Sequence, residues 1–156
     1  MDDAAMDDAA LDDAAMDDAA MDNAVPGPAP TGALSILGRT VRHPVEHVEC
    51  FPAPASGLTV RFSTDELASV CPVTGQPDLS HVVIEYHARA RCVESKSLKL
   101  YLWSFRDRPV FAEALAAEIA NEIMTAAAPA TVEVTVTQRP RGGIEVRATA
   151  VLTAPA

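Results

Sequence analysis

The sequence predicts an α+β fold in which two helices cover one face of a four-stranded antiparallel sheet. Three patterns indicate this fold: alternating apolar residues before residue 91, helical spacing between residues 97 and 123, and two further alternating segments after residue 130. A sheet with one apolar face needs such a layer of helices to cover it. The length of 156 residues suits one domain with a modest core.

The first part of the predicted domain is expected to form extended strands. The segments HVECF (47–51) and LTVRF (58–62) alternate apolar and polar residues on either side of the loop PAPASG. Residues 81–90, HVVIEYHARA, alternate more strictly and predict a half-buried strand. The side chains expected to face the core from this strand are Val82, Ile84, Tyr86 and Ala88.

Helical spacing follows from residue 97, where Leu98, Leu102 and Phe105 would share one face of a first helix. Pro109 suits the first turn of a second helix, because an N–H at that position has no partner within the helix. The expected apolar face of the second helix consists of Phe111, Leu115, Ala116, Ile119 and Ile123.

Two strands end the predicted order of strand, strand, helix, helix, strand, strand. The segments TVEVTVTQ (131–138) and IEVRATAVL (144–152) alternate apolar and polar residues. Gly142 and Gly143 between them supply the positive φ angles of a hairpin turn. Four strands leave two open edges, and assembly of subunits edge to edge into a larger barrel would cover them.

The formal net charge of −10 is concentrated in residues 1–24, which contain nine Asp and no Lys or Arg. Repeats of MDDAA fill this segment, and their step of five residues forms no apolar stripe on a helix. We therefore interpret residues 1–32 as a disordered acidic tail and Pro/Gly linker, with an acidic docking or solubility element as the alternative. Residues 33–156 are the predicted folded domain.

Composition excludes several classes of function. Residues 25–156 hold 13 acidic and 12 basic side chains, a balance that argues against direct binding of nucleic acid. No segment is long and apolar enough to predict a membrane helix. Cys50, Cys71 and Cys92 form neither a C-x-x-C pair nor a standard metal-ligand spacing. We expect a cytoplasmic protein without a metal site.

Cys71 is the first candidate for chemistry. It lies in the loop VCPVTGQPDL, and Asp78 follows seven residues later. A thiol beside a carboxyl group suits covalent addition followed by delivery of a proton. The residues alone leave open an inert thiol with an Asp that stabilises the turn.

The segment ESKSLKLY, residues 94–101, is the second candidate. Ser95 or Ser97 is expected to cap the helix that begins there, with Lys96 and Lys99 on one side of its first turn. Free N–H groups and two lysines suit an anionic ligand, whereas a capped helix with solvated lysines is the alternative. Glu113, in the first turn of the second helix, is either a ligand carboxylate or a favourable partner of the helix dipole.

Four motifs, CPVTGQPD, ESKSLKLYLWSFR, FAE and PRGGI, occur in this order within residues 62–145. Their order and spacing resemble the single-module NADPH-dependent 7-cyano-7-deazaguanine reductases, the nitrile reductases of the queuosine pathway. The resemblance implies the tunnelling fold, a ββααββ unit whose subunits join their sheets into barrels. It also implies a homo-oligomer of stacked rings, with active sites at subunit interfaces and a deazapurine substrate.

The resemblance assigns catalytic and cofactor roles by position. Cys71 matches the nucleophile that forms a thioimide with the nitrile, and Asp78 matches the proton donor. Lys96, Lys99 and Arg141 match positions associated with the cofactor NADPH.

The resemblance also assigns contacts with the substrate. Val93, Glu94 and Ser95 match the segment that contacts the deazaguanine, and Glu113 matches the carboxylate that anchors its guanine-like edge. Ala112 stands where the family usually has a His that contacts the substrate. This departure keeps two alternatives open: a divergent homologue that uses the thioimide for amidine formation or nitrile hydrolysis, and a purine-binding module without catalysis.

Overall fold

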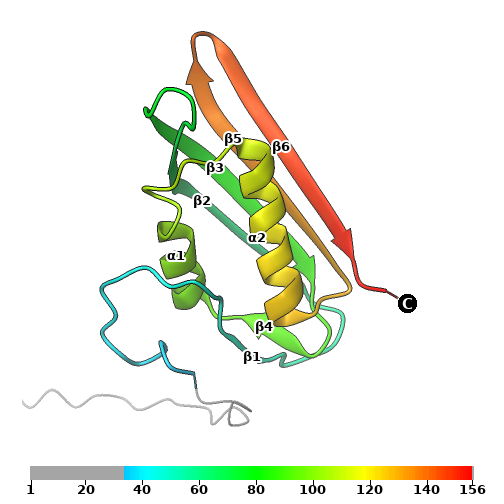
Figure 1. Ribbon diagram of the computed structural model, residues 1–156. Coiled ribbons are helices and arrows are strands. Elements are labelled where there is room, and N and C mark those ends of the chain that lie inside the picture. Colours follow the sequence, from blue (N-terminus) through cyan, green and yellow to red (C-terminus); the bar gives the residue numbers. More distant parts are fainter. Residues whose placement is uncertain (1–33, 156) are drawn as a thin grey trace, which may run out of the picture.

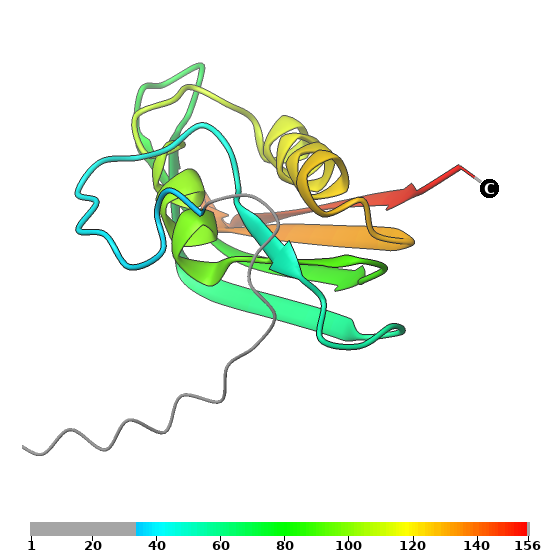
Figure 2. The same cartoon turned by 90° about the horizontal axis from the view of Figure 1, so that it is seen from below.

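The computed structural model describes residues 34–155, so the predicted tail and linker, residues 1–32, lie outside the described residues. Two helices lie on one face of a four-stranded antiparallel sheet with strand order β2-β3-β5-β6, which confirms the predicted α+β fold (Figures 1 and 2). The sheet strands are β2 (Thr59–Val70), β3 (Pro77–His87), β5 (Thr131–Arg141) and β6 (Ile144–Thr153). The helices are α1 (Ser95–Trp103) and α2 (Ala112–Ala127).

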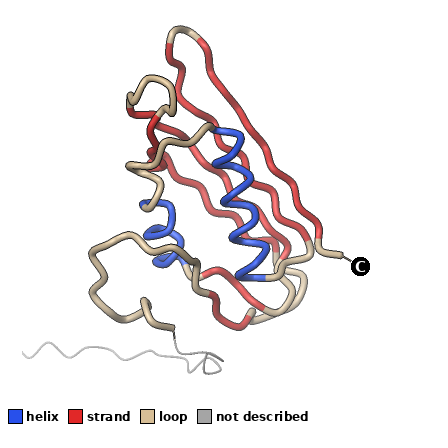
Figure 3. Tube along the Cα trace, viewed as in Figure 1, coloured by secondary structure: helices blue, strands red, loops and turns tan. Residues whose placement is uncertain are grey.

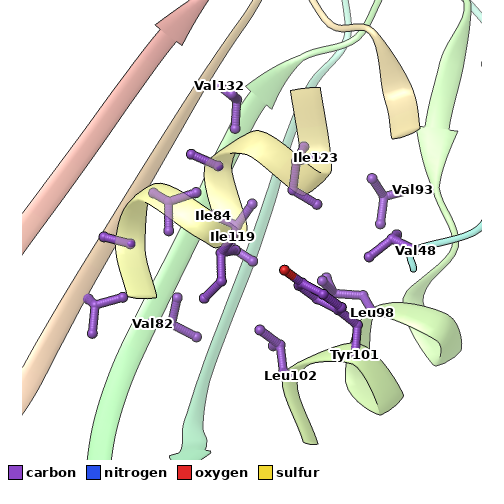
Figure 4. Close-up of a cluster of buried hydrophobic side chains, with 14 of the residues drawn as sticks. Val48, Val82, Ile84, Val93, Leu98, Tyr101, Leu102, Ile119, Ile123 and Val132 are labelled. Atoms are coloured by element: carbon purple, nitrogen blue, oxygen red, sulfur yellow. The ribbon is translucent and has the colours of Figure 1, made fainter. Parts of the chain in front are cut away.

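The core lies between the helices and the sheet. Alternate residues of β3 and β5 point to this side and are almost fully buried, among them Val82, Ile84, Tyr86, Val132, Val134 and Val136. Ile119 and Ile123 of α2 pack against them from above (Figure 4). Burial of a side chain of this size stabilises the fold by roughly 1.5–3 kcal/mol. This packing places α2 chiefly over β5 and β6 (Figure 2).

The first predicted strands differ from the observed ones in extent. Residues 58–62 are only the start of β2, which runs to Val70 and changes register at a bulge between Thr64 and Leu67. The bulge breaks the alternation of apolar residues, and this is why the pattern did not show the full strand. β3 begins at Pro77 and ends at His87, before Ala88.

Residues 47–51 do not join the main sheet. They contribute to β1 (Cys50–Pro52), which pairs with β4 (Arg91–Val93) in a separate two-stranded sheet. This small sheet lies near the end of β3 where His87 is found (Figure 1). It holds the chain in an extended form just before α1 begins.

The prediction for the start of the second helix was wrong. Pro109 lies before α2, in an extended segment beside Val70, and Phe111 is the N-cap residue with 55% of its surface exposed. The Val70 N–H donates to the Arg108 carbonyl oxygen (3.0 Å), and the Val110 N–H donates to the Val70 carbonyl oxygen (3.1 Å). Proline fits between these bonds because the pairing does not use its missing N–H.

The predicted hairpin turn is confirmed. Arg141 pairs with Ile144, and Gly142 and Gly143 between them have φ angles of +63° and +84°. Figure 3 shows this turn and the loop between β2 and β3 at the same end of the molecule. Among residues 34–155, no helix is both long and apolar enough to cross a membrane.

Candidate active site

Cys71 lies at the point where β2 turns into β3. Its N–H donates to the Gln76 carbonyl oxygen (2.9 Å), and its carbonyl oxygen accepts from the Gly75 N–H (2.9 Å). Gly75 has a φ of +68°, which glycine adopts without the strain that a side chain would cause. The loop is therefore a tight turn that presents Cys71 with 8% of its surface exposed.

The thiol of Cys71 is activated by its own loop. Its pKa is lowered from the ordinary 9.0 to about 7, chiefly by the Thr74 hydroxyl and then by the N–H groups of Thr74 and Val73. Burial opposes this effect, and the Arg141 side chain adds a smaller lowering. A large share of the thiol is ionised at neutral pH, which favours the nucleophile over the inert thiol that the sequence left open.

Asp78 and Arg141 complete a polar cluster with Cys71. Asp78 is the second residue of β3 and is only 6% exposed. Arg141 comes from the far end of β5, and its Nη1 lies 3.0 Å from Asp78 Oδ1 and 3.3 Å from Gln76 Oε1. The fold thus brings together two predicted catalytic residues and one residue predicted to bind the cofactor.

The start of α2 lies at the same end of the sheet. Backbone hydrogen bonds between Val70 and residues 108–110 hold the segment that leads into α2 beside Val70. Val70 is the last residue of β2 and directly precedes Cys71. Glu113 is exposed in the first turn of α2, and no side chain caps that helix. Ala112 is buried, with 3% of its surface exposed, so an imidazole at this position would need the neighbouring side chains to move.

The segment 93–95 is held by buried hydrogen bonds. Glu94, not Ser95 or Ser97, caps α1: its Oε1 accepts from the Lys96 N–H (2.8 Å) and its Oε2 from the Ser97 N–H (2.7 Å). The expectation of a serine cap was therefore wrong. The Glu94 side chain folds back onto the first turn of α1, and the Ser97 hydroxyl donates to the Glu94 carbonyl oxygen (2.8 Å).

The two lysines of α1 have different environments. The Lys96 ammonium donates to the carbonyl oxygens of Ile36 (3.0 Å) and Arg39, and so holds the N-terminal segment of the described chain against α1. Lys99 instead lines a cavity of about 680 Å³ between α1 and the strands β2 and β3. The lining combines apolar, aromatic, polar and basic side chains, among them Phe62, Ser95, Leu98, Lys99, Trp103 and Arg106.

The predicted site residues form two groups at opposite ends of one subunit. Val70 pairs with Pro77 beside Cys71, whereas the other end of the same strand pair joins Thr59 to His87. The second group, Val93 to Lys96, follows β4 near the His87 end (Figure 1). Within a single chain, Cys71 and Glu94 therefore do not share a site.

Sequence reasoning did not assign a role at the site to two residues that contact these groups, Thr74 and Tyr86. Thr74 was counted only as part of a loop, although its hydroxyl is the main cause of the lowered Cys71 pKa. Tyr86 was assigned to the core, but its buried hydroxyl also accepts from the Val93 N–H (2.9 Å). The polar atom of a tyrosine on a buried face was the available signal, since it needs a partner there. Within residues 34–155, no cluster of three or more His, Cys, Asp or Glu side chains could hold a metal ion.

The lowered pKa makes the reactivity of Cys71 depend on pH in a defined way. The thiolate fraction rises with pH, so the rate of alkylation by iodoacetamide should have its midpoint near pH 7. Thr74→Val removes the largest cause and should move the midpoint towards 9.0. Mass spectrometry of the peptide that contains Cys71 measures both curves.

Cys50 is the internal control for this measurement. Burial raises the pKa of its thiol to about 11, so its alkylation should stay slow across the same pH range. A midpoint near 9 for Cys71 in the unmodified protein would contradict the activation of the thiol by its loop.

Comparison with known proteins gives consistent matches. A family model described as "QueF-like protein" matches residues 77–155. The NADPH-dependent 7-cyano-7-deazaguanine reductase of Thioalkalivibrio sulfidiphilus (strain HL-EbGR7) is 42% identical over 103 residues, which cover 65% of this chain and 80% of that protein. The reductase of the same name from Granulibacter bethesdensis is 39% identical over 119 residues, covering 72% of this chain and 78% of that protein.

A solved structure is also similar. The crystal structure of the archaeosine synthase QueF-Like in the apo form aligns with a TM-score of 0.59 and 31% identity, covering 62% of this chain and 95% of that chain. This similarity confirms that the predicted subunit architecture, the tunnelling fold, is the one observed.

Proposed function

The chain belongs to the family of QueF-like proteins, and from this premise we propose that it reduces the nitrile of 7-cyano-7-deazaguanine to a primary amine with NADPH. One observation carries the proposal: an ionisable thiol, Cys71, lies in a cluster with a buried carboxyl group, Asp78. The names of the relatives supply the substrate and the cofactor.

Cys71 acts as the nucleophile in this proposal. Its thiolate adds to the nitrile carbon, one π bond of the nitrile breaks, and the nitrogen takes up a proton to give a thioimide. A nitrile accepts hydride poorly, whereas a protonated thioimide accepts it well, so addition of sulfur must come first. When the carbon–sulfur bond breaks after the first reduction, the thiolate of Cys71 is restored and an imine remains.

Asp78 delivers protons to the substrate nitrogen. General acid catalysis requires a proton donor within reach of the reacting atoms, and Asp78 is held beside the Cys71 loop by its ion pair with Arg141. The guanidinium also reaches Gln76 of that loop, so it keeps the acid and the nucleophile in a fixed relation. We assign Arg141 this positioning role in addition to the predicted contact with the cofactor.

The cavity beside α1 fits a dinucleotide in the chemistry of its lining. Lys99 and Arg106 offer charges for phosphate groups, and Trp103 and Phe62 offer aromatic faces for planar rings. NADPH bound there would supply the hydrides, two for each nitrile. Lys96 is engaged with backbone carbonyls, so its contact with a phosphate would have to replace those bonds.

The proposed substrate site needs a second copy of the chain. Val93, Glu94 and Ser95 lie at the opposite end of the subunit from Cys71, so a site that contains both groups would take one group from each of two copies. β2 and β6 are the outer strands of the described sheet and offer edges for this assembly. We place the enzyme in the cytoplasm, where Cys71 stays reduced.

A second function is favoured by two specific observations. Ala112 stands where a His is usual in the resemblance, and one similar structure is that of an archaeosine synthase rather than of a reductase. A divergent enzyme would form the same thioimide and then transfer an amine or water to it. The reductase names at 39–42% identity favour reduction over this alternative.

Stoichiometry tests the proposal. Purified full-length protein is mixed with 7-cyano-7-deazaguanine and NADPH, and absorbance in the nicotinamide band is followed together with the amine product. We expect about two NADPH oxidised for each nitrile consumed, because reduction of a nitrile to an amine takes four electrons. A covalent adduct on Cys71 without NADPH oxidation would favour the divergent enzyme, and the absence of any adduct would favour a binding module.

A further inference from the structure

One face of α1 carries side chains that line the cavity beside it. Ser95, Lys99 and Trp103 follow one another at intervals of four residues, and all three are exposed. Residues four apart lie one above the other on a helix, about one turn of 5.4 Å apart. Arg106 lies in the turn after α1 and lines the same cavity. These four side chains therefore form a row along the cavity.

The row gives the cavity a direction. Ser95 begins α1 near the end of the sheet where β2 starts, and Phe62 lines the cavity from that part of β2 (Figure 1). Arg106 lies towards the other end, because residues 108–110, which follow it, are bonded to Val70 at the end of β2. The two ends of the cavity therefore differ in the side chains that they offer to a ligand.

The positive charges of the cavity are unevenly placed. Within residues 34–155, neither Lys99 nor Arg106 forms an ion pair, and Glu66, which also lines the cavity, pairs with neither of them. Lys99 lies in the middle of the row and Arg106 at its end, whereas no Lys or Arg lines the part around Ser95 and Phe62. This distribution suits a ligand that has one anionic group in its middle and another at one end.

The charges of NADPH are distributed in this way. Its pyrophosphate lies between two planar rings, and a further phosphate is attached to the 2′ position of the adenosine ribose; NADH lacks that phosphate. With adenine at the Trp103 end, Arg106 meets the 2′-phosphate and Lys99 meets the pyrophosphate. The reverse orientation would place the 2′-phosphate at the Phe62 end, where no basic side chain lines the cavity.

We propose that Trp103 and Arg106 form the subsite for the adenosine end of NADPH, in which Arg106 binds the 2′-phosphate and so distinguishes NADPH from NADH. This inference rests on the proposed function and assigns an orientation to its cofactor. Aromatic side chains stack on nucleobases, and a guanidinium binds a phosphate through two parallel hydrogen bonds. The nicotinamide end is then directed towards Ser95, which belongs to the group that the resemblance assigns to the substrate.

Trp103 is the one tryptophan of the chain, so its fluorescence reports on this subsite. Full-length protein is titrated with adenosine 2′,5′-bisphosphate and, separately, with adenosine 5′-diphosphate, which contains the same atoms but has no phosphate at the 2′ position. We expect the bisphosphate to quench Trp103 and to bind about tenfold more tightly, because only its 2′-phosphate meets Arg106. Arg106→Ala should remove this difference and keep the thermal midpoint, since the side chain is exposed.

Two variants are matched controls for Arg106→Ala, which should weaken NADP⁺ binding about tenfold and leave NAD⁺ binding within about twofold. Lys99→Ala should weaken the binding of both, because both contain the pyrophosphate. Arg89→Ala removes an exposed cation that does not line the cavity and should change neither affinity. In turnover, Arg106→Ala should raise the KM for NADPH about tenfold with kcat within about twofold.

The outcomes separate this inference from the proposed function. Equal binding of the two adenosine phosphates, or an equal loss of NADP⁺ and NAD⁺ affinity in Arg106→Ala, would overturn the inference even in a protein that reduces the nitrile. Binding of the bisphosphate that calorimetry detects but that leaves Trp103 fluorescence unchanged would overturn it as well. Wild-type protein that oxidises no NADPH but prefers the bisphosphate through Arg106 would overturn the proposed function and support the subsite.

Discussion

Replacement of Cys71 by Ala is expected to abolish nitrile-dependent NADPH oxidation, with a fall in rate of about 10³-fold or more. Cys71 is the group expected to form the thioimide, because it lies in the loop that leads to the buried Asp78 and its thiol has a pKa of about 7. Cys50 has a raised pKa and lies in β1, near the other end of the subunit. The measurements are the NADPH oxidation rate and the intact mass of the protein after incubation with the nitrile.

Cys50→Ala is the matched control, since it also removes one thiol but should keep both the adduct and the activity. The adduct mass must appear in the unmodified protein and in Cys50→Ala, and must be missing from Cys71→Ala. Residual activity of Cys71→Ala above a tenth of the wild-type rate would show that reduction does not pass through a covalent thioimide.

The sequence predicted the fold well because its patterns are local. Alternation in residues 131–138 and 144–152 and the Gly142–Gly143 turn reappear as β5, β6 and their hairpin. The same reasoning failed where a contact between distant segments opposed a local preference. Pro109 suits a helix start in general, but here the pairing of its neighbours with Val70 keeps it extended.

The site was predicted less completely than the fold. Cys71 and Asp78 were identified from the loop that contains both, and the structure brings Arg141 to them from the distant end of β5. That contact depends on the neighbouring positions of β3 and β5 in the sheet, which no local pattern contains. The N-cap of α1 was predicted to be Ser95 or Ser97, because serine often caps helices. The longer side chain of the adjacent Glu94 reaches the free N–H groups and caps the helix instead.

The separation of the two groups leads to the second strong prediction. Cys71→Ala changes the group of residues around Cys71, and Glu94→Gln changes the group from Val93 to Lys96. Each variant alone is expected to be nearly inactive. If one active site takes Cys71 from one subunit and Glu94 from its neighbour, co-expressed variants form some sites in which both residues are intact. Random pairing makes this about one quarter of all sites, so the mixture should regain about a quarter of the wild-type activity.

The choice of variants makes this result specific. Glu94→Gln keeps an amide oxygen that can accept one of the two N–H groups capped by the carboxylate, so α1 should remain folded, as a thermal midpoint near the wild-type value would verify. Co-expression of Cys71→Ala with Asp78→Asn is the negative control. Both of these residues belong to one group on one subunit, so no pairing restores a complete site.

The two mixtures together distinguish the possible arrangements. Recovery with Glu94→Gln and none with Asp78→Asn requires a site shared between subunits, because in each single chain Cys71 and Glu94 lie at opposite ends of the sheet. No recovery in either mixture, from variants shown to assemble together, would mean that both groups act within one chain. The end-to-end distance along β3 would then have to be closed by a rearrangement of β4 and the start of α1, which the buried bonds of Tyr86 and Glu94 oppose.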